Sequence, residues 1–182
     1  MPRLVPASVS EAPGNYLTGA LWNAQVKAII DFLAGSGTNG VPRFKGYAST
    51  SQSLGTGTTD VAITLDTEDY DSDNGHSTST NTSRYTIQVA GTYLIVATLA
   101  FSTNGTGNRK VGININGANA RGGTAQSGGV AGNSWCATVA TEQALVVGDY
   151  VEIAAWQTSG GNLSTGAATG FGPVLMCQWI SS

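Results

Sequence analysis

From residue 41 onward the chain consists of short apolar-polar runs separated by turn residues. Successive side chains of a strand point to opposite sides, so these runs predict eight or nine β-strands in about 140 residues. An Asn116-Gly117 pair marks a hairpin turn between two of them. The absence of a helical crossover favours an all-β sandwich or jelly roll closed by Greek-key connections. The strands are expected at 43–49, 59–65, 84–89, 92–101, 109–115, 118–125, 134–145, 150–157 and 171–180.

The run 92–101 departs from this alternation because it is apolar on both faces. Tyr93 begins the set that shares one face, and Leu94 and Val96 belong to the opposite face. A surface strand of an antiparallel sandwich should present one polar face to water. Each exposed Leu or Ile forfeits about 1.5–3 kcal/mol of burial, so the second face needs a cover. Either another subunit covers it, or a loop or the N-terminal helix does so within a monomer.

The first forty residues follow a different pattern. Residues 1–14 hold three of the five prolines and predict an extended arm. Residues 18–34 repeat apolar side chains at helical spacing, with Thr18 as the expected N-cap and Gly35 as the stop. The apolar stripe contains Leu21 or Trp22, then Val26, Ile29, Ile30 and Leu33.

The spacing of this stripe leaves two roles open for the helix. Its steps of four, three and four residues match a short coiled-coil seam, so the helix either trimerises the chain or docks on a partner. Alternatively, it packs on its own domain. The Gly-rich run 35–40 is expected to be a hinge. The sequence therefore divides into 1–40, with arm, helix and hinge, and 41–182, with the β domain.

Composition and charge remove several classes of function. Charged residues make up 10% of the chain and the net charge is -3, so no basic stripe is available for nucleic acid. No run approaches the ~20 apolar residues of a membrane span, and no secretory leader is expected. Cys136 and Cys177 lie in strand-like runs, where buried free thiols are expected and a disulfide is the alternative.

A family resemblance enters through ordered elements between residues 43 and 180. The succession "YDSDNGHSTSTNTSRYTIQVAGTYLIVATLAF", "NRKVGININGANA", "LVVGDYVEIAAWQ" and "FGPVLMCQW" resembles the C1q/TNF-like jelly roll. That resemblance implies a homotrimer in which one sheet of each subunit packs around a three-fold axis. Tyr93, Leu94 and Val96 would then serve core and subunit packing.

A second resemblance lies in the N-terminal segment "PGNYLTGALWNAQVKAIIDFLAG" and the loop "LDTEDYDSDNGHSTST". Both are similar to virion proteins of tailed bacteriophages. The resemblance implies a virion structural protein assembled in the bacterial cytoplasm, either a trimeric capsid decoration or a head fibre attached through its N-terminus to the major capsid protein. A minor tail or tail-tip protein contacting the host, or a glycan-binding module, is the alternative.

Few residues suggest chemistry. Asp69, Asp71 and Asp73 have the alternating spacing of a calcium loop, but the glycine and glutamate of an EF-hand are missing. A Ca²⁺ site is therefore only a weak candidate. The alternative is a loop whose Asp and Asn side chains cap its own turns. His76 is the only histidine and no nucleophile elbow accompanies it, so no catalysis and no other cofactor is expected. Host-glycan binding through the Gly-rich loops is a further possibility.

Overall fold

The computed structural model describes residues 5–35, 40–167 and 170–182, and its two main sheets are antiparallel throughout. The first sheet has the order β4 (Thr67–Asp71), β1 (Arg43–Tyr47), β12 (Val174–Ser181), β6 (Gly91–Phe101) and β9 (Trp135–Leu145). The second has the order β3 (Val61–Ala62), β10 (Tyr150–Gln157), β7 (Asn108–Ile115) and β8 (Ala118–Gly128), with β5 (Arg84–Thr86) also pairing with β10. A short pair joins β11 (Leu163–Ser164) and β2 (Ser53–Leu54).

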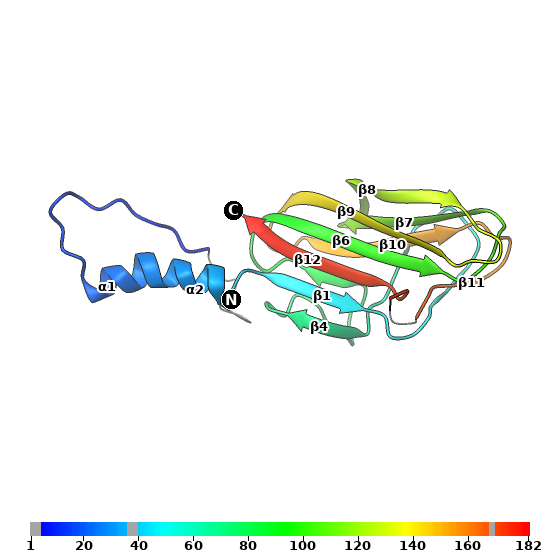
Figure 1. The fold of residues 1–182 in the computed structure, drawn as a ribbon, viewed down its shortest axis with the longest axis horizontal. Coiled ribbons are helices and arrows are strands. Elements are labelled where there is room, and N and C mark those ends of the chain that lie inside the picture. The colour runs from blue at the N-terminus through cyan, green and yellow to red at the C-terminus, as the bar shows by residue number, and fades with distance from the viewer. Residues whose placement is uncertain (1–4, 36–39, 168–169) are drawn as a thin grey trace.

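The core lies between these two sheets (Figure 1). Inward-facing side chains of β6, β7 and β10 are fully buried, as strand alternation requires. Phe44 of β1 stacks on Tyr85 of β5 with ring centroids 4.6 Å apart, which links the first sheet to the second. Alternate residues along most of β6 face away from this core. Tyr93 is therefore buried, while Leu94 is only half-buried.

The strand predictions are confirmed in position for most of the chain and wrong in the segment from 53 to 71. The expected strand 59–65 shortens to β3, and the short pair of β2 and β11 was not predicted. The acidic segment that contains Asp69, Asp71 and Asp73 was interpreted as a loop, yet residues 67–71 form β4. A strand at the edge of a sheet keeps its side chains in water, so charges are tolerated there and also discourage pairing with another chain.

The predicted helix forms, but it contains an irregular turn. It begins with α1 (Gly19–Trp22), passes through the π-helical turn η1 (Asn23–Lys27) and ends with α2 (Ala28–Ala34). The Thr18 hydroxyl accepts the N–H of Leu21 at 3.1 Å, which confirms the N-cap. Gly35 is the C-cap, as expected. Residues 36–39 of the hinge predicted at 35–40 lie outside the described residues.

The helix extends from the end of the sandwich at which the C-terminus lies (Figure 1). The arm runs beside it, and Gln25 donates a hydrogen bond to Glu11 at 2.6 Å. Phe32 meets Trp179 of β12 edge to face, with ring centroids 5.1 Å apart. Gly91 leaves room for the Trp179 ring at the start of β6, because a Cβ on Gly91 would lie 2.1 Å from Nε1 of Trp179. No helix in the described part of the chain is long and apolar enough to span a bilayer.

Candidate functional site

The outward face of the first sheet carries a row of apolar side chains. Register places Val96 of β6 between Met176 of β12 and Ala140 of β9. Because side chains alternate along each strand, neighbours two residues away share this face. We call the set the apolar strip, and it comprises Leu94, Val96, Ala140, Val174 and Met176.

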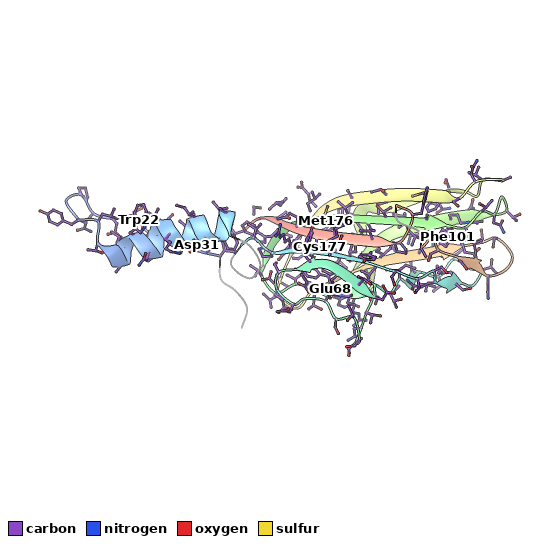
Figure 2. The ribbon with its side chains drawn as sticks, turned by 60° about the horizontal axis from the view of Figure 1, so that its bottom comes forward. Trp22, Asp31, Glu68, Phe101, Met176 and Cys177 are labelled. Carbon is purple, nitrogen blue, oxygen red and sulfur yellow. The ribbon has the colours of Figure 1, made fainter. Side chains whose placement is uncertain are left out.

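Water reaches the apolar strip in the single chain. Leu94, Val96 and Met176 are only half-buried, and Ala140 is exposed. Met176 lies on β12, the strand that continues toward the helix (Figure 2). In the described part of the single chain, neither a loop nor the helix therefore buries this face completely. An apolar sheet face of this kind is a candidate interaction surface.

Polar groups flank the apolar strip. Lys45 of β1 forms an ion pair with Asp69 at 2.6 Å, and the Asp69 carboxylate raises the pKa of the lysine by accepting its hydrogen bond. On the other side the hydroxyls of Thr98 and Thr138 lie 2.9 Å apart. An apolar centre with a polar rim is the usual anatomy of a protein-protein interface.

The stripe of the N-terminal helix is also largely uncovered. Trp22, Ile30 and Leu33 are 46%, 53% and 65% exposed, while Val26 and Ile29 are half-buried. Figure 2 shows Trp22 on the part of the helix far from the sandwich. The π-helical turn changes the residues per turn between Trp22 and Ala28, so the 4-3-4 spacing no longer describes one straight seam.

Sequence reasoning left Phe32 out of the stripe, and Phe32 is the buried residue of α2. Its position follows from the helical period, because residue 32 lies about 100° around the helix from the centre of the stripe. The helix thus packs on the sandwich through Phe32 and leaves the predicted stripe on another side.

The three aspartates of the calcium hypothesis do not come together. Asp69 pairs with Lys45, whereas Asp71 accepts the backbone N–H groups of Asp73 at 3.1 Å and His76 at 2.8 Å. Among the described residues, no group of three acidic, histidine or cysteine side chains could hold a metal ion. Asp71 therefore acts within its own loop, which was the alternative to a calcium site.

His76 lies in the wall of a polar cavity, with its side chain withdrawn from solvent. Its side chain is buried, its Nδ1 lies 2.6 Å from Oε1 of Glu68, and its Nε2 lies 3.0 Å from the carbonyl of Thr82. The ring also packs against Phe44 with centroids 5.1 Å apart. These contacts hold the loop that follows β4 onto the core, and the two ring nitrogens are engaged by groups that are not nucleophiles.

The cysteines are both free, and their burial differs from the prediction. Cys177 on β12 is buried, as expected, and burial raises the pKa of its thiol. Cys136 is exposed, which corrects the expectation that both are buried. It lies on the edge strand β9 opposite Ala100 and faces outward, because the next residue toward the N-terminus, Trp135, faces the core. The two side chains therefore point to opposite sides of one sheet.

A polar cavity of about 390 Å³ lies beside the loop after β4 and the start of β10. Arg84 and Tyr150 form part of its lining, and the guanidinium carbon of Arg84 lies 4.1 Å from the centre of the Tyr150 ring. The sequence analysis did not identify this site. Arg84 and Tyr150 are far apart in the chain and only the pairing of β5 with β10 brings them together.

The tryptophans of the strands serve packing. Trp135 and Trp179 are buried and Trp156 is half-buried, so the three do not form an exposed platform for a sugar ring. Trp179 contacts Phe32, and Trp135 lies 5.9 Å from the ring of Phe101. The exposed tryptophan is Trp22, on the helix.

Comparisons with known proteins identify the fold. No protein-family model and no curated protein sequence matches the chain. Among solved structures, murine APRIL is similar at a TM-score of 0.57 and 8% identity, covering 76% of this chain and 98% of its own. The globular domain of zebrafish complement 1qA is similar at 0.54 and 14% identity, covering 76% and 97%. Eiger TNF from S. frugiperda is similar at 0.52 and 12% identity, covering 78% and 93%.

These similarities and the sheet topology define a C1q/TNF-like jelly roll preceded by a short helical segment. At such low identity the similarity shows the fold alone. Function must be argued from the surfaces of this chain.

Proposed function

We propose that this protein is a non-enzymatic structural protein of a tailed-bacteriophage virion, a trimeric capsid decoration or head fibre attached through its N-terminal segment. The observation that carries the proposal is the helix stripe. Trp22, Ile30 and Leu33 remain exposed on a helix that is packed against the jelly roll through Phe32. A soluble monomer gains nothing from such exposure, whereas a docking segment requires it.

The apolar strip supports the trimeric part of the proposal. Three copies that bury Val96 and Met176 against one another would remove the remaining apolar surface of the first sheet from water. The resemblance to C1q/TNF-like jelly rolls implies this arrangement about a three-fold axis. A closed rotational assembly of identical chains satisfies each copy of the face without leaving an open end.

The positions of the apolar strip and the helix stripe suit them to different roles. The apolar strip lies on the sandwich, while the stripe lies on a helix beyond the end of the sandwich (Figure 1). A trimer formed through the apolar strip would carry three helix stripes at the same end, and that end would face the particle. The partner that they would contact is the major capsid protein, and the jelly roll would project outward.

The proposed role is not enzymatic, and the position of His76 is consistent with that. Glu68 and Thr82 engage both of its ring nitrogens, and Phe44 packs against the ring. The function proposed here requires only burial of apolar surface, with no cofactor and no chemical step.

The test is incorporation of a stripe variant into phage particles. Ile30→Asp with Leu33→Asp places two charges on the exposed stripe, and Val130→Asp with Val147→Asp is the matched control on exposed sandwich positions. We expect the first variant to fold, by circular dichroism, and to be absent from purified particles, while the control is incorporated. Normal incorporation of the stripe variant would contradict the proposal. The copy number per particle distinguishes a capsid position, with many copies, from a tail position with few.

A further inference from the structure

The polar cavity at Arg84 has the features of a built binding site. Arg84 and Tyr150 lie on β5 and β10 of the second sheet, and their neighbours Tyr85 and Val151 face the core. Alternation along the strands therefore directs Arg84 and Tyr150 to the outer face. We call the cavity the Arg84 pocket.

A buried carboxylate holds Arg84 in place. Oε1 of Glu152 accepts a hydrogen bond from Nε of Arg84 at 3.1 Å and from the Ser83 hydroxyl at 2.6 Å. The Glu152 side chain is 7% exposed, whereas that of Arg84 is 39% exposed. The pair thus presents its cation to solvent and hides its anion.

Tyr150 fixes the plane of the guanidinium. The guanidinium carbon lies 4.1 Å from the ring centroid, which is a stacking distance. Within the described residues the two terminal nitrogens of Arg84 donate no hydrogen bond. An arginine with its Nε engaged and its plane fixed offers those terminal N–H groups as a preset fork for a planar anion.

The rest of the pocket offers amides and hydroxyls. Asn74 and Asn81 have positive φ values of 53° and 50°, a conformation that asparagine tolerates better than most residues. The polar side chains around Arg84 in the lining belong to Asn74, Ser77, Thr80, Asn81, Thr86 and Gln88. Such groups match the hydroxyls of a sugar ring.

The carboxylate of Asp149, next to Tyr150 in the chain, is engaged by groups other than Arg84. Asp149 precedes Tyr150, and its oxygens accept hydrogen bonds from Asn116 and from the N–H of Val146, each at 2.8 Å. Arg84 is therefore the fixed charge of the described lining that an incoming ligand meets.

We propose that the Arg84 pocket binds a carboxylate-bearing saccharide unit, with the carboxylate on the terminal nitrogens of Arg84 and the ring hydroxyls on the surrounding amides. An acidic peptide would offer the same carboxylate. It is disfavoured because the described lining provides polar side chains rather than an apolar subsite for a peptide side chain. The site lies on the second sheet, away from the apolar strip, so it stays open if the strip forms a trimer. The proposal goes beyond a structural role and does not depend on it.

The experiment compares two ligands that differ in one group. Methyl β-D-glucuronide and methyl β-D-glucoside are titrated into the full chain, and binding is followed by NMR chemical shifts. We expect the glucuronide to bind at least about tenfold more tightly than the glucoside, because a charge-assisted bidentate contact is lost in the neutral sugar. Acetate, and a short acidic peptide, serve as carboxylates without the sugar ring and should bind at least about tenfold more weakly.

Three variants locate the site. Arg84→Gln should weaken glucuronide binding at least about tenfold, whereas Arg121→Gln removes the same charge from an exposed position on β8 and should have no effect. Because Arg84→Gln leaves Glu152 buried without its partner, Asn81→Gly provides a second variant that tolerates the positive φ and removes one amide. It should weaken the glucuronide by a few fold.

Each other outcome overturns the proposal. If the glucuronide and the glucoside bind equally, Arg84 does not recognise the carboxylate. If acetate or the peptide binds as tightly as the glucuronide, the sugar ring is not recognised. Failure of the glucuronide to bind, or binding that is unchanged in both Arg84→Gln and Asn81→Gly, rejects the pocket as the site.

Discussion

At the scale of single residues, the buried charged side chains Lys110 and Arg109 are held by several hydrogen bonds, although Nε of Arg109 has no partner among the described residues. Nζ of Lys110 lies 2.6 Å and 2.7 Å from the two carboxylate oxygens of Asp60, and 2.6 Å from Oδ1 of Asn119. Arg109 donates to the backbone carbonyls of Thr106, Asn108 and Asn104. A buried charge without partners is strongly destabilising, so these contacts are requirements of the fold rather than additions to it.

The Lys110–Asp60 pair gives a prediction at this scale. The Lys110 side chain is 8% exposed, so Asp60→Ala leaves a buried ammonium without its carboxylate. We expect a loss of about 3 kcal/mol in the free energy of unfolding, measured by urea denaturation. The control is Asp69→Ala, which breaks a pair whose side chains are about 40% exposed, and it should cost less than about 1 kcal/mol. Equal losses in the two variants would contradict this reasoning.

At the scale of elements, an aromatic contact links the N-terminal helix to the jelly roll. Phe32 packs edge to face on Trp179, while the neighbouring Leu33 is 65% exposed. The arm adds a hydrogen bond between Gln25 and Glu11 along the helix itself. Short helices generally depend on packing more than on sequence propensity, so we expect the buried Phe32 to contribute strongly to the position of the helix.

Phe32→Ala tests this attachment. We expect faster amide hydrogen exchange across residues 19–34, with exchange in β6 and β12 unchanged, because the helix loses its contact while the sandwich keeps its core. Leu33→Ala removes an exposed side chain of the same helix and should leave both regions as they are. If Phe32→Ala left exchange in the helix unchanged, another contact would have to hold it.

At the scale of the whole molecule, two apolar surfaces remain open: the apolar strip on the first sheet and the stripe on the helix. Either of them could drive self-association, and the choice determines which one is left for a partner. A sheet face and a short interrupted helix differ in this respect. The strip is continuous across β9, β6 and β12, whereas η1 interrupts the stripe.

Light scattering of the full chain and of a chain beginning at Val41 separates the two. We expect trimers from both, because the apolar strip lies within the truncated chain. Val96→Glu should convert the truncated chain to a monomer, while Val130→Glu, on an exposed sandwich residue outside the strip, should not. A trimer from the full chain alone would assign association to the helix, and two monomers would contradict the strip as an interface in solution.

Local patterns in the sequence determined most of the elements. Short apolar runs bounded by turn residues predicted β7, β9 and β10, and the run that is apolar on both faces predicted β6. Helical spacing and the Thr18 cap predicted the helix. The same local signals predicted that Leu94 and Val96 share a face opposite Tyr93, since that relation depends only on the chain direction.

Only the tertiary structure decided which distant segments meet. The acidic segment 67–71 forms the edge strand β4 because it pairs with β1, and no periodicity in that segment predicted the pairing. Arg84 and Glu152 are 68 residues apart, and Phe32 meets Trp179 across most of the chain. Sequence periodicity shows which residues share one side of an element, but strand order, register and packing decide what that side meets. For that reason Leu94, Val96 and the helix stripe were visible in the sequence, whereas the rest of the apolar strip and the Arg84 pocket were not.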